Sequence, residues 1–266
     1  MGTLGGSASD ALAPVLGAPR QRACVVGAGP VATYLLADSG DVLAIVSCAA
    51  VRVPCAVVLG AGTPVPAALH PGASAWVGDG AVGWAGGQVR VRRWWAAATV
   101  GTGSWSPRRT QQLAERLRDH HLPPGVAPVL HAAARCLQDG DGAAAGNHLV
   151  TVLGLGPGLT PSADDAVAGL LLAARAAAGA VADLPGALVA RAAPARTTAV
   201  SAALLAHAAA GRAAPQVVGA VEALAGRGDL GPALDALWAL GHSSGADTAA
   251  GILAAIRGDR TVRRVA

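Results

Sequence analysis

The pattern of hydrophobic residues changes once along this chain, near residue 105, and that change limits the folds open to it. Between residues 22 and 105 the apolar residues come in short runs separated by glycine and proline. Such runs at this spacing predict β-strands in a small sheet, sandwich or barrel. The runs are Ala23–Val26, Val42–Val46, Ala56–Leu59, Ser74–Val77, Ala81–Trp84 and Gln88–Trp95. We therefore predict an N-terminal β-rich domain over residues 1–105, with a small, barrel-like sheet.

After Pro107 the spacing of apolar residues becomes helical. The first predicted helix is capped by Thr110 and ends at Arg118, and Asp139–Gly146 is predicted to be a loop of small residues. The other predicted helices cover Val126–Leu137, Ser162–Ala178, Leu184–Ala193, Thr197–Ala210, Ala214–Ala225, Pro232–Leu240 and Asp247–Ile256. The predicted fold class is therefore α+β, with a mostly helical C-terminal domain over residues 106–266.

The composition excludes several classes of function. All 20 basic residues are arginine, so chemistry that needs a lysine amine is excluded. The net charge is only +4, and no aromatic residues interleave the densest basic cluster (Arg257, Arg260, Arg263 and Arg264), so we expect no nucleic-acid partner. We find neither a signal peptide nor a membrane-spanning run, and we expect a cytoplasmic protein with no membrane partner. The four cysteines lie in apolar surroundings and are predicted to be buried free thiols.

One glycine-rich segment imitates a nucleotide-binding motif. Gly27-Ala28-Gly29 follows an apolar run, as in a dinucleotide fold, but no acidic residue stands about twenty positions later to hold a ribose. The apolar segment that follows is interrupted by Ser39-Gly40. We therefore interpret this segment as a turn between strands. The sequence does not firmly imply any cofactor, and Mg²⁺ is the one that stays possible.

The first motif with chemical potential runs from Gly154 to Asp165. Its three glycines, which include Gly156 and Gly158, permit positive φ angles and close approach of a ligand to the backbone. Thr160 or Ser162 would cap the following helix, whose free N–H groups favour an anion.

Asp164 and Asp165 follow directly in this motif. Carboxylates at a helix N-terminus are favourable as simple capping groups, yet two of them would repel a bare phosphate. A divalent cation such as Mg²⁺, or proton transfer to an amide nitrogen, would resolve that conflict. We expect a functional role for both carboxylates, and the sequence leaves open whether a metal is bound.

A second motif, Gly241-His-Ser-Ser-Gly-Ala-Asp-Thr248, has the same spacing of serine, aspartate and glycine as the first. Ser162 aligns with Ser244, Asp165 with Asp247, and Gly169 with Gly251. Two serine-capped helices with glycine at a close crossing would give the same pattern. Our hypothesis is that both helix N-termini face one pocket about a local pseudo-twofold axis and present N–H groups to one anionic ligand.

Two histidines are singled out. His242 lies in the second turn between glycine and two hydroxyls and is the best candidate for acid–base work. His207 lies on the predicted helix that begins at Thr197 and is as compatible with a buried structural histidine as with a ligand. The remaining histidines, predicted to be structural or exposed, are His70, His120, His121, His131 and His148.

The predicted site combines these residues. The proposed catalytic or metal-positioning groups are Asp164, Asp165 and His242. The predicted substrate-binding residues are Gly156, Gly158, Thr160, Ser162, Thr198, His207, Ser243, Ser244, Gly245 and Asp247.

The two motifs, joined by the Arg196-Thr197-Thr198 to His207 segment, resemble the AllH-like family over about Val150 to Leu253. The resemblance implies a transferase subunit in an oxamate carbamoyltransferase of anaerobic allantoin and purine catabolism. This enzyme converts oxalurate and phosphate into oxamate and carbamoyl phosphate. The implied partners are acyl-CoA-synthetase-like and other subunits of that enzyme.

One position departs from the family pattern, which has glycine where this chain has Ala163. A positive φ at that position would strain alanine by about 1 kcal/mol or more.

Two alternatives to an enzymatic role stay open. The first is that the chain is a non-catalytic partner or regulatory subunit. The second is that it is a stand-alone protein that binds a small carboxylate.

Overall fold

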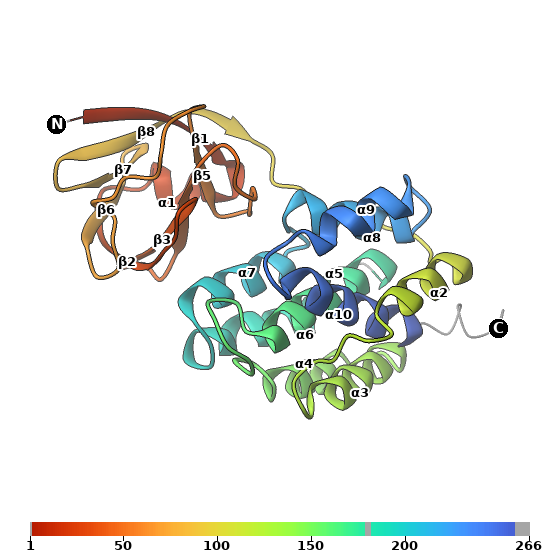
Figure 1. The fold of residues 1–266 in the computed structure, drawn as a ribbon. Helices are drawn as coiled ribbons and strands as arrows, with labels where there is room; N and C mark the ends of the chain where they lie inside the picture. The colour runs from red at the N-terminus through yellow and green to blue at the C-terminus, as the bar shows by residue number, and fades with distance from the viewer. Residues whose placement is uncertain (1, 179–181, 259–266) are drawn as a thin grey trace. The chain divides into compact units, whose positions relative to one another are not determined.

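The computed structural model describes residues 2–178 and 182–258 and shows a strand-rich part followed by a helical part (Figure 1). The chain divides into two compact units, Met1–Ala97 and Ala98–Ala266. Three arginines of the predicted basic cluster, Arg260, Arg263 and Arg264, lie outside the described residues. The α+β class is confirmed, because strands make up the first unit and helices the second.

The first unit is a closed eight-stranded barrel with the strand order β1-β5-β4-β3-β2-β6-β7-β8. The β1–β8 pair that closes the barrel is parallel, as is β4–β5, and the other neighbours are antiparallel. The strands are β1 (Gly2–Ser9), β2 (Gln21–Ala28), β3 (Ala32–Ala37), β4 (Val42–Val46), β5 (Ala56–Leu59), β6 (Ser74–Gly78), β7 (Ala81–Trp84) and β8 (Gly87–Trp95). A 3-10 turn (Asp10–Leu12) and the short helix α1 (Ala13–Gly17) follow β1.

The segment that imitates a nucleotide fingerprint is a strand turn, as predicted. Gly29 and Pro30 connect the antiparallel pair β2 and β3, and the Gly29 amide donates to the Ala32 carbonyl at 2.8 Å. No helix follows the glycines, so the geometry that holds a pyrophosphate is absent from this segment.

The second unit is a bundle of helices. They are α2 (Pro107–Arg116), α3 (Val126–Gln138), α4 (Gly142–Val150), α5 (Ser162–Ala178), α6 (Asp183–Ala192), α7 (Ala199–Ala209), α8 (Pro215–Leu224), α9 (Leu230–Trp238) and α10 (Ser244–Gly258), with a 3-10 turn at Ala193–Ala195. The predicted cap of the first helix is wrong, because α2 begins at Pro107 and the Ser106 hydroxyl accepts from the Arg109 amide.

The predicted loop Asp139–Gly146 is also wrong, since α4 begins within it. The Asp141 side chain caps α4 by accepting from the Ala144 amide at 2.8 Å. A Cβ added at Gly146 would lie 3.0 Å from the Pro185 Cα, so the missing side chain lets α4 pack closely on α6. Tertiary packing therefore overrides the weak helix propensity of the glycines.

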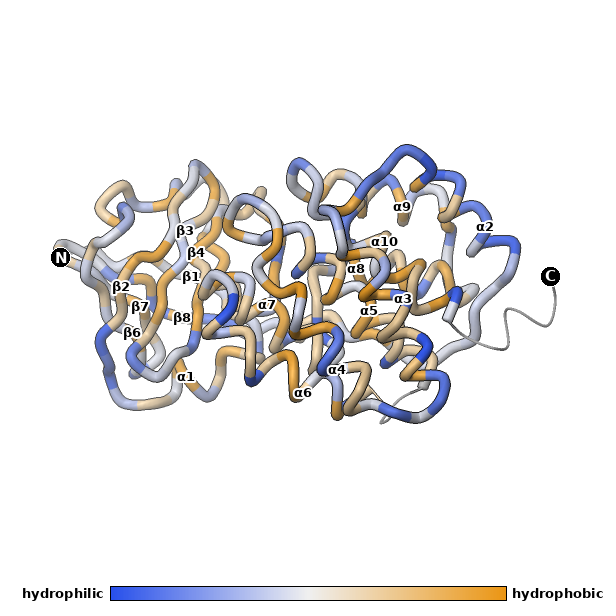
Figure 2. The backbone as a smooth tube through the Cα atoms, turned by 90° about the horizontal axis from the view of Figure 1, so that it is seen from below, coloured by the Kyte–Doolittle hydropathy of each residue, from blue (hydrophilic) through white to orange (hydrophobic). Residues whose placement is uncertain are grey.

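Helix α5 runs through the middle of this bundle and packs on α10, α7 and α3. Its residues Leu170, Leu171 and Leu172 are all fully buried. Hydrophobic colouring follows α5, whereas the outer helix α2 is hydrophilic (Figure 2). A helix that is apolar on all sides is typically buried inside a bundle. The glycine-rich loop before α5 is therefore attached to a helix that is packed on several sides.

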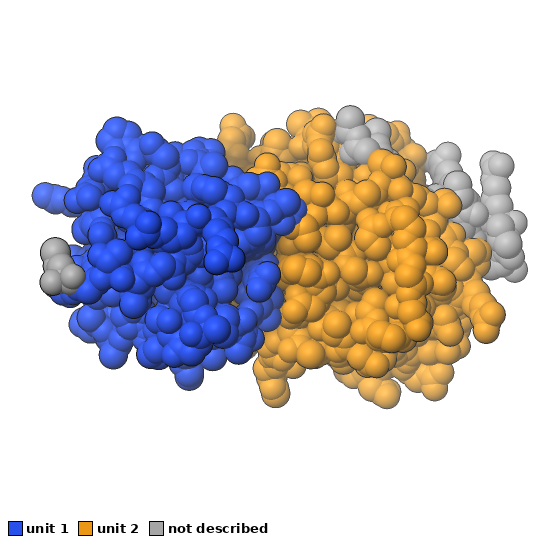
Figure 3. All heavy atoms as spheres, turned by 90° about the horizontal axis from the view of Figure 1, so that it is seen from above, with its two compact units in different colours: residues 1–97 blue, residues 98–266 orange. Residues whose placement is uncertain are grey.

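Each unit has buried hydrophobic residues of its own, and Figure 3 colours the two separately.

The prediction of four buried cysteines is wrong, because Cys24 and Cys48 are exposed and only Cys55 is fully buried. In the described part of the chain, no helix is both long enough and apolar enough to cross a membrane.

Candidate functional site

Helices α5 and α10 cross at two glycines in a reciprocal way. A Cβ added at Gly169 would lie 2.1 Å from the Thr248 carbonyl oxygen, and one added at Gly251 would lie 1.8 Å from the Ala166 carbonyl oxygen. In the internal alignment Ala166 corresponds to Thr248, so the two helices exchange equivalent contacts about an approximate local twofold axis. Glycine at both positions lets the two backbones touch, as expected for a close crossing.

This crossing brings the beginnings of the two helices together. The Thr160 and Ser244 hydroxyls are 3.2 Å apart and share a hydrogen bond. Thr160 does not cap α5, because the helix begins at Ser162 and the Pro161 carbonyl accepts from the Asp164 and Asp165 amides. The two motifs are therefore one structural feature, which we call the paired-turn site: residues 154–165 and 241–248.

The glycine-rich loop before α5 adopts the backbone angles predicted for it. Gly154, Gly156 and Gly158 have φ angles of 82°, 123° and 90°. A Cβ at Gly154 would lie 2.3 Å from the Arg196 carbonyl oxygen, so glycine is also required there by packing. Ala163 lies within the first turn of α5 and is fully buried, and it is not among the described residues with positive φ. The strain considered for alanine at this position does not arise.

Asp164 is a fully buried carboxylate with three hydrogen-bond donors. The Gly154 amide donates to Oδ1 at 2.8 Å, while the Ser201 hydroxyl, at 2.6 Å, and the Thr197 hydroxyl donate to Oδ2. Asp164 thus joins the glycine-rich loop to the beginning of α7. These contacts suit a positioning role, and the predicted catalytic role of Asp164 stays a prediction.

Asp165 is placed differently. Its Oδ2 atom is buried and has no hydrogen-bond partner among the described residues. Burial above all, together with the charges of Asp247 and Asp164, raises the pKa of Asp165 to about 7, against the hydroxyls of Ser244 and Thr160, which lower it. A carboxyl group with a pKa near 7 can both donate and accept a proton at neutral pH.

Asp247 is the counterpart of Asp165 on α10 and is only 1% exposed. Its Oδ1 lies 2.9 Å from His120 Nε2, while its Oδ2 is buried and has no partner among the described residues. The paired-turn site therefore holds two carboxylates, half-buried Asp165 and fully buried Asp247, each with a buried oxygen that nothing in the described chain satisfies. Buried polar atoms without partners are uncommon and indicate a ligand, an ion or a proton.

His120 was predicted to be structural or exposed and was not included in the predicted site. Its contact with Asp247 places it there. His120 lies between α2 and α3, 127 positions from its partner, so no local pattern links the two residues. His120 also lines a cavity of about 290 Å³ with His121, His131, Leu130 and Leu253. Burial lowers the pKa of His131, and the neighbouring charges of Arg257 and Arg135 lower it further.

The other predicted residues fall into two groups. Thr198 lies at the site: its hydroxyl donates to the Leu159 carbonyl at 2.5 Å and accepts from the Ser201 amide at 3.0 Å. Ser162, Ser243 and Gly245 lie in the two turns. His242 is exposed in the second turn, and its side chain makes no hydrogen bond or ion pair with the described residues. By contrast, His207 lies about 13 Å along α7 from Thr198, so the structure does not bring it to the turns.

Within residues 2–178 and 182–258, no group of three or more His, Cys, Asp or Glu side chains is arranged to hold a metal ion. Mg²⁺ is often bound by only one or two carboxylates together with substrate phosphates and water. Asp165 and Asp247 supply two carboxylates, so the donor set fits a cation that arrives with its substrate.

Comparison with known proteins shows a family whose sequence pattern covers the paired-turn site. The model of the family described as oxamate carbamoyltransferase subunit AllH matches residues 152–256. This range contains both turns of the paired-turn site, the helices α5 to α9 and most of α10, and it lies entirely in the second unit. The resemblance to the AllH-like family is thereby confirmed. No curated protein and no solved structure matches the chain.

Proposed function

We propose that this AllH-like chain is a subunit of an oxamate carbamoyltransferase and binds an anionic carbamoyl or phosphate group at its paired-turn site. The observation that carries the proposal is the pair of carboxylates, Asp165 and Asp247, each with a buried and unsatisfied oxygen where α5 and α10 begin. Two helix N-termini at one place supply N–H groups that attract an anion. The two carboxylates would repel that anion if both were charged and no cation were present.

Two arrangements remove this repulsion. Because the pKa of Asp165 is about 7, a large fraction of this carboxyl is protonated at neutral pH and can donate a hydrogen bond to the anion. Alternatively, Asp165 and Asp247 would hold a Mg²⁺ ion, which would supply positive charge to offset that of the anion. The first arrangement predicts binding that weakens as the pH rises above 7, and the second predicts binding that requires Mg²⁺.

The proposed reaction needs two proton transfers at defined atoms. A phosphate oxygen forms a bond to the carbamoyl carbon of oxalurate, and the bond from that carbon to the oxamate nitrogen breaks. The leaving nitrogen must gain a proton, and the attacking phosphate loses one. Asp165, with a pKa of about 7, is suited to deliver the first, and Asp247, held by His120, is placed to accept the second. His242 lies exposed in the second turn, where it can contact the ligand.

The test is calorimetric titration of the purified chain with carbamoyl phosphate, phosphate and oxalurate, with and without Mg²⁺. We expect Asp165→Ala and His242→Ala to weaken binding by about tenfold or more. Asp119→Asn and His148→Ala change exposed residues of the same unit and are the matched controls, with unchanged binding expected. A folded chain that binds none of the three ligands would exclude this proposal.

A specific observation favours the alternative of a non-catalytic partner subunit. Leu155 and Leu159 belong to the glycine-rich loop, yet they are 41% and 42% exposed. Exposed leucines beside a site suit contact with another chain. If no ligand binds but Leu155→Ser and Leu159→Ser disrupt assembly with acyl-CoA-synthetase-like or other subunits, the partner role is supported instead. Tight binding of a carboxylate without turnover, alone or with partners, would indicate a stand-alone binding protein.

A further inference from the structure

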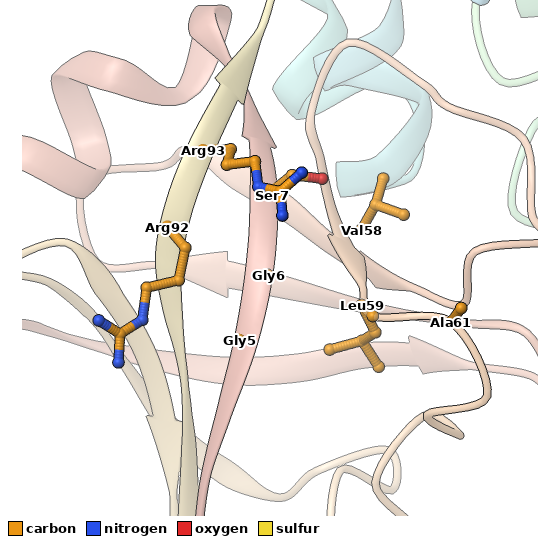
Figure 4. Close-up of a pocket in the computed structure, with 9 residues that line it drawn as sticks. Gly5, Gly6, Ser7, Val58, Leu59, Ala61, Arg92 and Arg93 are labelled. Carbon is orange, nitrogen blue, oxygen red and sulfur yellow. The ribbon is translucent and has the colours of Figure 1, made fainter.

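A second cavity lies in the barrel unit, which the family match does not cover. It has a volume of about 410 Å³ and is bordered by β1, the end of β5 with the turn after it, and β8 (Figure 4). Arg92, Arg93 and Ser7 are the polar side chains that line it. None of its lining residues belongs to the paired-turn site.

A β-bulge explains why two consecutive arginines line this cavity, although their guanidinium groups extend to different sides of β8 (Figure 4). In the parallel β1–β8 pair Gly6 is opposite Val91 and Ser7 is opposite Arg93, so Arg92 is an extra residue without a partner in β1. Consecutive residues of a regular strand point to opposite faces, and a bulge redirects a side chain. Figure 4 shows Arg93 extending across β1 towards Ser7.

The charge of the two arginines is not compensated nearby. Both side chains are exposed, and neither forms an ion pair or a hydrogen bond with the described residues. No acidic residue lines the cavity. Guanidinium groups donate paired hydrogen bonds whose geometry matches carboxylate and phosphate oxygens.

Gly5 leaves one side of the cavity open. It is not among the glycines with positive φ, and an added Cβ would meet only the Arg92 Cγ, at an ordinary distance of 3.7 Å. Neither backbone conformation nor packing therefore requires glycine at this position. The consequence of the missing side chain is accessible backbone beside the stem of Arg92.

We propose that this cavity binds a small anion with a phosphate or carboxylate group, held by the Arg93 guanidinium with the Ser7 hydroxyl as a further donor, while Arg92 adds positive charge beside the cavity. The proposal is independent of the function assigned to the paired-turn site. A bound anion would satisfy the Arg93 guanidinium and fill the space above Gly5.

The test is calorimetric titration of the full chain with inorganic phosphate and, separately, with oxalate as a carboxylate probe. We expect the Arg92→Ala/Arg93→Ala variant to bind at least one probe about tenfold or more weakly than the wild type. Arg22→Ala is the matched control, because Arg22 is an exposed arginine on β2, which β6 and β7 separate from β8. Gly5→Val should weaken the same binding while both guanidinium groups remain.

Asp165→Ala separates the two sites, because it should leave the arginine-dependent binding unchanged. Failure of the paired-turn proposal would therefore not affect this result. The cavity proposal is overturned if neither probe binds the wild type at millimolar concentration. It is equally overturned if the double arginine variant binds both probes like the wild type, or if Arg22→Ala weakens binding as much.

Discussion

At the scale of single residues, Asp165 makes stability depend on pH. Its pKa is about 7 in the folded chain and near 3.8 when exposed, so the folded state holds a proton that the unfolded state has released between these values. Stability is therefore lost as the pH rises from about 4 to about 7, by at most about 4 kcal/mol. Asp165→Asn carries no such charge. We expect the variant to be more stable than the wild type at pH 8 and equally stable near pH 4, measured by urea unfolding. A constant difference across this range would contradict the raised pKa.

His120 should matter for stability as well as for the site. His120→Ala removes the partner of Asp247 Oδ1 and leaves a second unsatisfied oxygen on a buried carboxylate. We expect a loss of about 1–3 kcal/mol in the free energy of unfolding. The neighbouring His121→Ala variant, at an exposed position, is the control. In a double-mutant cycle with Asp247→Asn the two changes should be non-additive, and additivity would show that the contact contributes nothing.

At the scale of elements, the reciprocal crossing of α5 and α10 can be tested through its glycines. Gly169→Ala places a Cβ against the Thr248 carbonyl oxygen, which forces the helices apart at an expected cost of about 1–3 kcal/mol or more. Gly219→Ala is the control, because Gly219 lies within α8 and an added Cβ would meet nothing within 4 Å. That change should raise stability by about 0.5–1 kcal/mol. Thermal unfolding of both variants gives the comparison, and a neutral Gly169→Ala would contradict the close crossing.

Some strands and turns could be predicted from the local sequence, and others could not. β4 and β5 are continuous apolar strands and were predictable, as were the positive φ angles of the glycine-rich loop. β1 was not predictable, because its sequence Gly-Thr-Leu-Gly-Gly-Ser-Ala-Ser shows no apolar alternation. Its place is fixed by tertiary packing, since a Cβ at Gly6 would meet Val89 at 2.7 Å and Val57 at 3.1 Å. The His120–Asp247 pair escaped prediction for the same reason, because a contact across 127 residues leaves no local pattern.

At the scale of the whole molecule, all described contacts of the paired-turn site come from the second unit. Asp165, Asp247 and His120 lie within it, and so does the buried cluster that surrounds α5. The cavity with Arg92 and Arg93 lies in the barrel. The two proposed ligand sites therefore have separate structural supports.

This separation predicts the behaviour of a chain shortened to residues 98–266. Because its hydrophobic core is internal, the fragment should fold and show a cooperative helical transition by circular dichroism. It should keep the ligand binding that depends on Asp165 and lose the binding that depends on Arg92 and Arg93. The full chain carrying Arg92→Ala/Arg93→Ala is the matched control, since it removes the barrel cavity's charge but keeps the barrel. A folded fragment without the Asp165-dependent binding would mean that the barrel contributes directly to the paired-turn site, and the ligand would then have to be sought across both units.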